Sequence, residues 1–175
     1  MQKKRLVLGG GCFWCIEAVF SDVKGVNSAI SAYAGGLRPN PTYENICTGA
    51  TGHAEVVDIS YDSDTVSLDD LLDIFFVIHD PTTLNRQGAD AGTQYRSVIY
   101  YANNEELKII QNSITKHQKV FSEKIVTEIS PLPEVYHAET YHQNYYKQNS
   151  TQGYCQVVIA PKIQKFMTTF PDKLG

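Results

Sequence analysis

The chain has 175 residues, of which 42% are hydrophobic, and a formal net charge of −4. This length allows a hydrophobic core without disulfide support, so we expect residues 1–175 to form a single, monomeric domain. The dispersed Lys and Arg residues give no reason to expect binding to nucleic acid or to an anionic membrane. Four cysteines are too few for a disulfide scaffold. With no signal-peptide or membrane-helix pattern, these features favour a cytoplasmic protein.

Taken in order, the hydrophobic patterns predict alternating strands and helices. We expect strands over 4–8, 26–34, 53–61, 96–101, 124–129 and 154–159. Helices are expected over 14–23, 67–79, 103–120, 138–148 and 162–175. The polar segment 82–94 is expected to be a functional loop. This alternation favours the α+β class: a loop-rich two-layer sandwich in which helices cover a mixed β-sheet with a ferredoxin-like βαβ core.

Three glycines follow the first predicted strand, and Cys12 comes directly after them, where the first helix begins. The N-terminus of a helix stabilises negative charge, which lowers the pKa of a thiol at that position. Glycines also leave room beside the sulfur for a substrate. The pattern therefore predicts a reactive Cys12, although a buried and inert cysteine is the alternative that it leaves open.

Cys12 and Cys15 form a Cys-x-x-Cys pair, which is typical of thiol–disulfide oxidoreductases and of half a zinc site. Zinc needs four ligands, and the chain has no second paired motif, so we predict no metal site. The two residues between the cysteines are Phe13 and Trp14. Their large rings suit a small apolar substrate better than a disulfide-exchange surface.

Glu55 alternates with Val57 and Ile59 in the predicted strand 53–61. On the core face, burial would raise the pKa of its carboxyl group, whereas at the rim the group would be solvated. The pattern alone favours the solvated position. Segment 137–146 is rich in rings, which we expect on an amphipathic helix with its tyrosines in the core rather than in a cage or metal site.

Seven motifs, in order between about Leu6 and Ile163, resemble the peptide methionine sulfoxide reductase family, A class. They are Gly11-Cys12-Phe13-Trp14, Pro41-Thr42-Tyr43, Thr51-Gly52-His53-Ala54-Glu55, His79-Asp80-Pro81-Thr82, Arg86-Gln87-Gly88, Gly92-Thr93-Gln94-Tyr95-Arg96-Ser97 and Tyr141-His142-Gln143. The resemblance implies reduction of the S epimer of methionine sulfoxide, free or in proteins, with thioredoxin as reductant, or dithiothreitol in vitro, and no bound cofactor.

The resemblance also implies roles for the residues around Cys12. Cys12 would attack the sulfoxide sulfur as the nucleophile, and Glu55 would protonate the oxygen, which is a poor leaving group. Tyr43 and Tyr95 match the hydroxyl groups that bind this oxygen.

The same resemblance places the substrate beside two rings and one acid. Phe13 and Trp14 would enclose the methyl group on the sulfur. Asp90 matches a family aspartate that would orient Tyr95, Arg96 or the substrate backbone.

The thiol that resolves the oxidised Cys12 is less well defined by the sequence. Many members have Gly at the position of Cys15 and resolve with a cysteine near a glycine-rich C-terminus. Here we favour Cys15, and Cys155 in the predicted strand 154–159 is the alternative. Cys47 is expected to be a bystander. A general thiol–disulfide oxidoreductase that uses Cys12-x-x-Cys15 is the competing function, and it would not need Glu55.

Overall fold

The protein is described by a computed structural model over residues 2–175. Its elements in chain order are β1 (Lys3–Gly9), α1 (Phe13–Phe20), β2 (Val26–Ala34), α2 (Tyr43–Cys47), β3 (Ala54–Asp62), α3 (Leu68–Ile78), β4 (Arg86–Gln87), β5 (Asp90–Ala91), η1 (Thr93–Tyr95), β6 (Val98–Tyr101), α4 (Asn104–Gln118), β7 (Glu128–Pro131), β8 (Val135–His137), η2 (Thr140–His142), α5 (Tyr145–Asn149), η3 (Cys155–Ile159), α6 (Ala160–Thr169) and η4 (Pro171–Lys173).

Six strands form one mixed sheet in the order β7-β6-β1-β3-β2-β8. Its four central strands, β6-β1-β3-β2, pair antiparallel, and α1 and α3 supply the two crossover connections. This is the order of a ferredoxin-like βαβ core. The edge strand β7 pairs parallel with β6, which makes the sheet mixed. The predicted α+β class and βαβ core are therefore confirmed.

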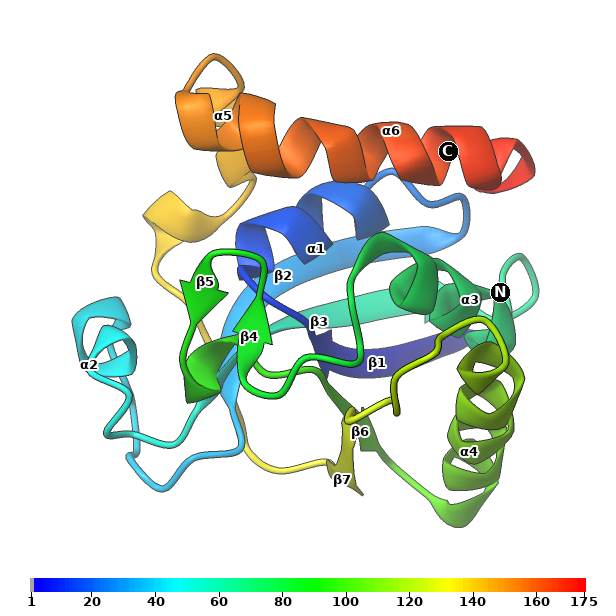
Figure 1. Cartoon of the computed structure of the whole chain (residues 1–175), viewed down its shortest axis with the longest axis horizontal. Helices are drawn as coiled ribbons and strands as arrows, with labels where there is room; N and C mark the ends of the chain where they lie inside the picture. Colours follow the sequence, from blue (N-terminus) through cyan, green and yellow to red (C-terminus); the bar gives the residue numbers. More distant parts are fainter. Residues whose placement is uncertain (1) are drawn as a thin grey trace.

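The main core lies between one face of the sheet and the helices. Figure 1 shows α1 and α6 together on the same side of the sheet, with α3 beside them. Alternate side chains of the central strands, such as Leu6, Leu8, Val57 and Ile59, pack in this core, and the residues between them form a smaller cluster on the opposite face. Glu55 alternates with Val57 and so points to the helical side.

The last predicted strand is wrong, because residues 155–159 form a π-helical turn that continues into α6. The β-branched run of Val157, Val158 and Ile159 favours a strand locally. Burial follows a helical period instead: Cys155 and Ile159 are buried, whereas Val157 is 75% exposed. The wider turn immediately precedes Pro161, whose ring and missing N–H disrupt a regular α-helix.

The helix predicted over 138–148 is also wrong as one element. The segment forms the short turns η2 and α5, separated by Asn144 in a left-handed conformation with φ of 53°. The functional loop predicted over 82–94 contains the small hairpin β4–β5 and the start of η1. Both segments lie beside the start of α1, so the irregular parts of the chain build the site.

Ion pairs join α3 to its neighbours. Lys116 of α4 lies 2.8 Å from Asp73, and Lys173 of η4 lies 3.1 Å from Asp70.

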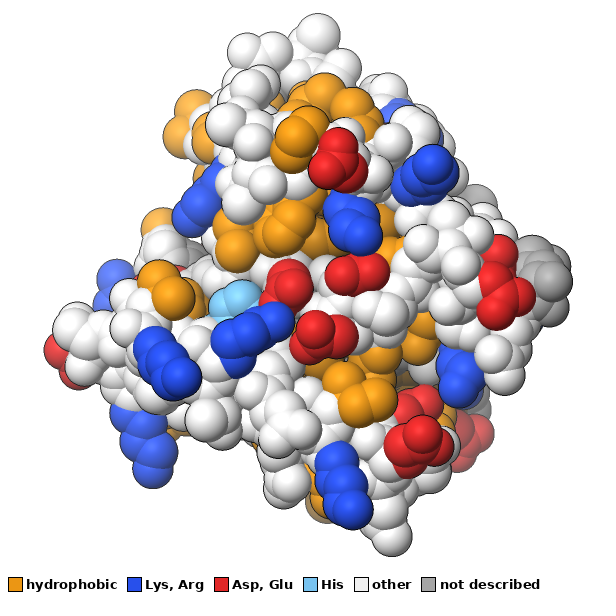
Figure 2. All heavy atoms as spheres, turned by 90° about the vertical axis from the view of Figure 1, so that its right-hand side faces the viewer, with side chains coloured by type: hydrophobic (Ala, Val, Ile, Leu, Met, Phe, Trp, Pro, Cys, Tyr) orange, Lys and Arg blue, Asp and Glu red, His pale blue; other side chains and the backbone are white. Residues whose placement is uncertain are grey.

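On the face drawn in Figure 2, acidic and basic side chains are interspersed around apolar patches. Among the described helices, none combines the length and apolar character needed to cross a membrane.

Candidate active site

Cys12 occupies the N-cap position of α1, directly after the glycine turn that ends β1. Gly11 has φ of +87°, and a Cβ atom at Gly9 would overlap the carbonyl oxygen of Glu55. These two positions therefore need glycine to bring the start of α1 against β3. The turn leaves Cys12 only 8% exposed.

Burial raises the pKa of the Cys12 thiol well above its ordinary value. Its hydrogen bond to Cys15 and the nearby charge of Glu55 act in the same direction, whereas the backbone N–H of Trp14 lowers the pKa. The predicted lowering of the Cys12 pKa is therefore wrong, because burial outweighs the helix N-terminus. The Cys12 sulfur is therefore a protonated thiol at neutral pH.

Glu55 lies on β3 below the start of α1 and is 1% exposed. Its Oε1 atom accepts the backbone N–H of Phe13 at 3.1 Å, and its Oε2 atom has no hydrogen-bond partner within residues 2–175. Burial raises the pKa of Glu55 to about 8. The solvated position that the pattern favoured is wrong, and the carboxyl group is protonated at neutral pH.

Tyr43 and Tyr95 are each held in place through a hydrogen bond of their own backbone. The N–H of Gly11 donates to the carbonyl of Tyr95 at 3.1 Å, which ties the long loop to the glycine turn. The N–H of Tyr43 donates to Glu139 at 2.9 Å. Burial, with a contribution from the charge of Glu55, raises the pKa of both phenols. Both hydroxyl groups are therefore protonated donors near Glu55.

Rings surround Trp14 on several sides. Tyr145 stacks on it at a centroid distance of 3.7 Å and an interplanar angle of 6°, and Tyr154 presents an edge at 5.9 Å. The indole N–H donates to Nδ1 of His142 at 3.0 Å, which puts the imidazole proton on Nε2. Phe13 is fully buried against Tyr33. These rings form an aromatic cluster around Trp14, and Tyr145, Tyr146 and Tyr154 pack against the core as expected, although not on one regular helix.

A small cavity of about 140 Å³ lies beside the two thiols. Its wall includes Cys12, Cys15, Asp90, Tyr154 and Lys162. The Tyr154 hydroxyl donates to Asp90 at 2.8 Å and lies 4.0 Å from the sulfur of Cys15. We call this space the thiol cavity.

Asp90 therefore has a different partner from the residues expected for it. It accepts from Tyr154, which the sequence analysis did not single out, whereas Arg96 pairs with Glu128 at 3.2 Å. Tyr154 was expected in the strand 154–159, so the pattern gave no reason to place it at the site. The helical turn over 155–159, which begins after Tyr154, sets its side chain beside Asp90 and Cys15.

The other two cysteines lie in different surroundings. Cys155 is fully buried on η3, and burial, with the charge of Cys15, raises its pKa. Cys47 is exposed at the end of α2.

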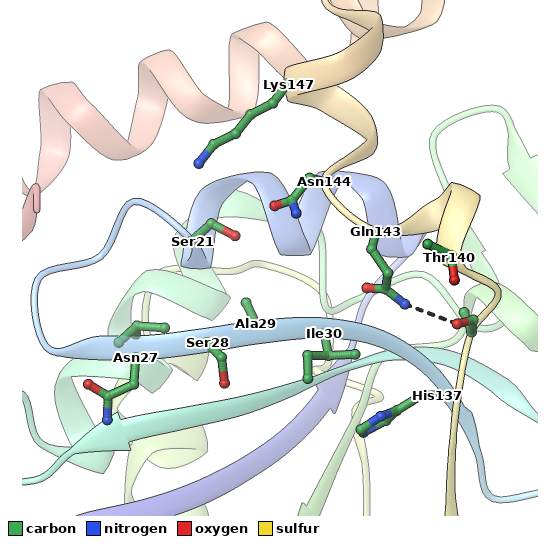
Figure 3. A pocket seen from close by; sticks show the side chains of 12 residues that line it. Ser21, Asn27, Ser28, Ala29, Ile30, His137, Thr140, Gln143, Asn144 and Lys147 are labelled. Carbon is green, nitrogen blue, oxygen red and sulfur yellow. Dashed lines mark hydrogen bonds between the residues drawn. The ribbon is translucent and has the colours of Figure 1, made fainter.

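A larger polar groove of about 530 Å³ lies away from the thiols, between the end of α1, β2 and the segment 137–147. Figure 3 shows Asn144 and Lys147 above it, Ser28 and Ile30 of β2 below it, and the Gln143 amide bonded at its end. The described residues that line the groove include none of the cysteines. The candidate active site is therefore the thiol cavity together with the neighbouring aromatic cluster around Trp14.

Two adjacent thiols at a helix N-terminus, a protonated carboxyl group and two phenols define a thiol-based oxidoreductase that can protonate an oxygen leaving group. In agreement, the sequence profile of the family described as Peptide methionine sulfoxide reductase matches residues 4–174. The chain belongs to the peptide methionine sulfoxide reductase family. It is a thiol-dependent enzyme that reduces methionine sulfoxide.

Individual relatives agree over nearly the whole chain. A Polynucleobacter asymbioticus protein named Peptide methionine sulfoxide reductase MsrA is 56% identical over 174 residues, which cover 98% of this chain and 92% of the relative. The reduced form of Mxr1 from Saccharomyces cerevisiae superimposes with a TM-score of 0.82 and 34% identity, covering 88% of this chain and 90% of Mxr1. A structure of Mxr1 in complex with Trx2 gives a TM-score of 0.58 and 26% identity, covering 82% and 85%.

Proposed function

We propose that this enzyme reduces the S epimer of methionine sulfoxide, free and in proteins, with Cys12 as the nucleophile and Glu55 as the proton donor. The observation that carries the assignment is the protonated, buried Glu55, which accepts the N–H of Phe13, the residue that follows the nucleophile. A carboxylic acid that keeps its proton at neutral pH can give it to the sulfoxide oxygen as the S–O bond weakens.

The first step is a two-electron transfer between sulfurs. The Cys12 thiol gives up its proton as its sulfur attacks the sulfoxide sulfur, Glu55 protonates the oxygen, the hydroxyl group passes to Cys12 as the S–O bond breaks, and methionine leaves. The substrate is thereby reduced and Cys12 is oxidised to a sulfenic acid, while the proton from the thiol restores the acid form of Glu55. Tyr43 and Tyr95 donate hydrogen bonds to the oxygen while it carries negative charge. Their raised pKa values keep both hydroxyl protons in place for this role.

The methyl group of the substrate lies against Phe13 and Trp14 in this proposal. The stack of Tyr145 on Trp14 and the bond from Trp14 to His142 hold the indole in one orientation. A fixed apolar wall favours a thioether methyl and excludes water from the reacting sulfur. Asp90, held by Tyr154, lines the thiol cavity with Cys12 and Cys15 and is proposed to orient the substrate backbone.

Cys15 is proposed to resolve the sulfenic acid. The Cys15 thiol loses its proton, a Cys12–Cys15 bond forms, the S–O bond breaks, and the hydroxyl group leaves with that proton as water. Cys15 already shares a hydrogen bond with Cys12, and both line the thiol cavity. Cys155 is the alternative resolving thiol, but its burial on η3 gives it a raised pKa.

Thioredoxin is proposed to reduce the disulfide, so that electrons come from a protein dithiol and not from a bound cofactor. The structure of Mxr1 with Trx2 supports this choice of partner. Four free cysteines suit a reducing compartment, and we propose that the enzyme works in the cytoplasm as a monomer with one domain over residues 1–175.

Turnover by single-cysteine variants tests the proposal. With free or peptide methionine-S-sulfoxide, Cys12→Ser should be inactive with both thioredoxin and dithiothreitol. Cys15→Ser should keep turnover with dithiothreitol and lose it with thioredoxin, and Cys47→Ser is the matched control that keeps both. Thioredoxin turnover by Cys15→Ser, together with its loss in Cys155→Ala, would transfer the resolving role to Cys155.

A further inference from the structure

Lys162 is a charged residue that the proposed reaction has not used. It lies in the first turn of α6, and its Nζ atom donates to the carbonyl oxygen of Ile78, the last residue of α3, at 2.9 Å. The C-terminal end of a helix favours a positive charge, so this bond fixes the ammonium group. An ammonium group has three N–H donors, and one bond leaves two of them for other partners.

The same side chain lines the thiol cavity beside Cys12 and Cys15. Among the described residues that line this cavity, Lys162 is the only basic one. Gly10 and Gly11 form the wall next to Cys12 and carry no side chain into the space. Lys162 thus borders the same small, largely closed space as both proposed reacting cysteines.

From this geometry we propose that Lys162 is a positioning residue for the resolving step, which holds Cys15 as a thiolate while it attacks the oxidised Cys12. The inference rests on the proposed role of Cys15. A fixed positive charge across a small cavity favours the anionic form of a thiol, and the thiolate is the nucleophile in disulfide formation. The same positive charge also makes Cys15 a better leaving group when the reductant opens the disulfide.

Several other charged or titratable groups act on Cys15. The hydrogen bond from Cys12 lowers the Cys15 pKa most, burial opposes it, and the charge of Lys162 and the Tyr154 hydroxyl lower it further. Asp90 of β5 raises it. Glu55 of β3 and Cys155 of η3 also interact with the Cys15 charge. Lys162 is therefore the cation of this set, and its charge favours the Cys15 thiolate whereas the charge of Asp90 opposes it.

The first test measures the Cys15 thiolate directly. In a Cys12→Ser, Cys47→Ser, Cys155→Ala background, Cys15 is the remaining cysteine, and its ultraviolet thiolate absorbance is followed against pH. Lys162→Met should raise the midpoint by about one pH unit, and Lys162→Arg should restore it. Lys165→Met is the matched control, because Lys165 lies on the same helix but does not line the thiol cavity among its described residues.

The second test separates the two chemical steps. In a Cys47→Ser, Cys155→Ala background, one equivalent of methionine sulfoxide is added to the reduced enzyme, and methionine release and loss of free thiols are timed. Lys162→Met should release methionine and lose the first thiol at the parent rate, but lose the second thiol, Cys15, ~10-fold more slowly near neutral pH, with recovery at higher pH. Lys162→Arg should match the parent.

An unchanged Cys15 midpoint in folded Lys162→Met, or equal slowing of both steps, would overturn the inference. Circular dichroism and the unfolding midpoint of each variant show whether loss of the bond from Lys162 to Ile78 has changed the fold or its stability. Failure of the Cys15 assignment is distinguishable, since Cys15→Ser would then keep thioredoxin turnover whatever Lys162 does to the thiolate.

Discussion

The carboxyl group of Glu55 accepts the backbone N–H of Phe13 at 3.1 Å, and so a side chain of β3 is bonded to the first turn of the helix that carries Cys12. This single contact fixes the distance between the proposed acid and the nucleophile. It uses only one carboxyl oxygen, while Oε2 lacks a hydrogen-bond partner within the described chain. The second oxygen is therefore available to carry the proton to the substrate.

Replacing this acid should strongly impair catalysis without unfolding the protein. In Glu55→Gln the amide oxygen can still accept the Phe13 N–H, but no acidic proton remains. We expect kcat/KM for methionine-S-sulfoxide to fall ~10²–10⁴-fold, the usual contribution of general acid catalysis. Steady-state kinetics with dithiothreitol measure the change.

Glu17→Gln is the matched control for this substitution. Glu17 is also a buried carboxyl group, but it bonds to Ser31 and Asn144 instead of the site. Its kcat/KM should stay within a few-fold of wild type. Reduction of a small disulfide by Glu55→Gln should be unaffected, since disulfide exchange needs no oxygen protonation. Full sulfoxide activity in Glu55→Gln would contradict the acid role.

The activity should also fall at alkaline pH. Burial raises the pKa of Glu55 to about 8, so above that pH the acid loses its proton. We expect kcat/KM to decrease through a midpoint near this value, measured across a pH series at constant ionic strength. A decrease with the same midpoint in Glu55→Gln would assign the titration to another group.

Glu55 should make the fold less stable as the pH rises. The pKa of Glu55 in the folded protein lies above its ordinary value of 4.5. Its contribution to the free energy of unfolding is therefore fully present below about pH 4.5 and is lost progressively between about pH 4.5 and pH 8. The free energy of unfolding should fall by up to ~1.4 kcal/mol per pH unit in this window. Urea denaturation of wild type and Glu55→Gln measures the difference, which should grow with pH.

The regular part of the fold was predictable because its patterns are local. The strand predicted over 26–34 matches β2, and the helices predicted to begin at 67 and 103 do begin there, with Ser67 and Asn103 as the capping residues of α3 and α4. Residues 155–159 were not predictable in this way. Their β-branched side chains favour a strand, and only packing of Cys155 and Ile159 against the core selects the helix.

The site was predictable in its residue types but not in its electrostatics. The motifs identified the candidate site residues Cys12, Glu55, Tyr43 and Tyr95, and the structure places them together. The direction of the Cys12 pKa was wrong because no local pattern reports how deeply a helix N-terminus is buried. Tyr154 and Lys162 come from segments with long-range contacts, so spacing along the chain could not assign them.

Glu139 should position Tyr43 through the backbone. Its carboxylate accepts the Tyr33 hydroxyl at 2.8 Å and the Tyr43 N–H at 2.9 Å. Glu139→Gln should lower kcat/KM ~10-fold, because a misplaced phenol stabilises the oxygen less well, and should cost ~1–3 kcal/mol of stability. Glu123→Gln, at an exposed position, is the control for charge loss. Unchanged kinetics in Glu139→Gln would show that Tyr43 is held by other contacts.

Gly9 should be required for the approach of β1 to Glu55. A Cβ atom at this position would overlap the Glu55 carbonyl oxygen and lie 3.1 Å from a Val56 side-chain methyl. The first contact is with backbone inside a sheet, which cannot rotate away, so β1 and β3 must separate. Gly9→Ala should cost ~1–3 kcal/mol and lower sulfoxide reduction, because Glu55 moves relative to Phe13. Gly153→Ala is the matched control, since a Cβ atom there meets nothing within 4 Å of the described chain. Urea unfolding midpoints and kcat/KM compare the two variants, and equal behaviour would show that the sheet absorbs the added methyl group without moving the acid.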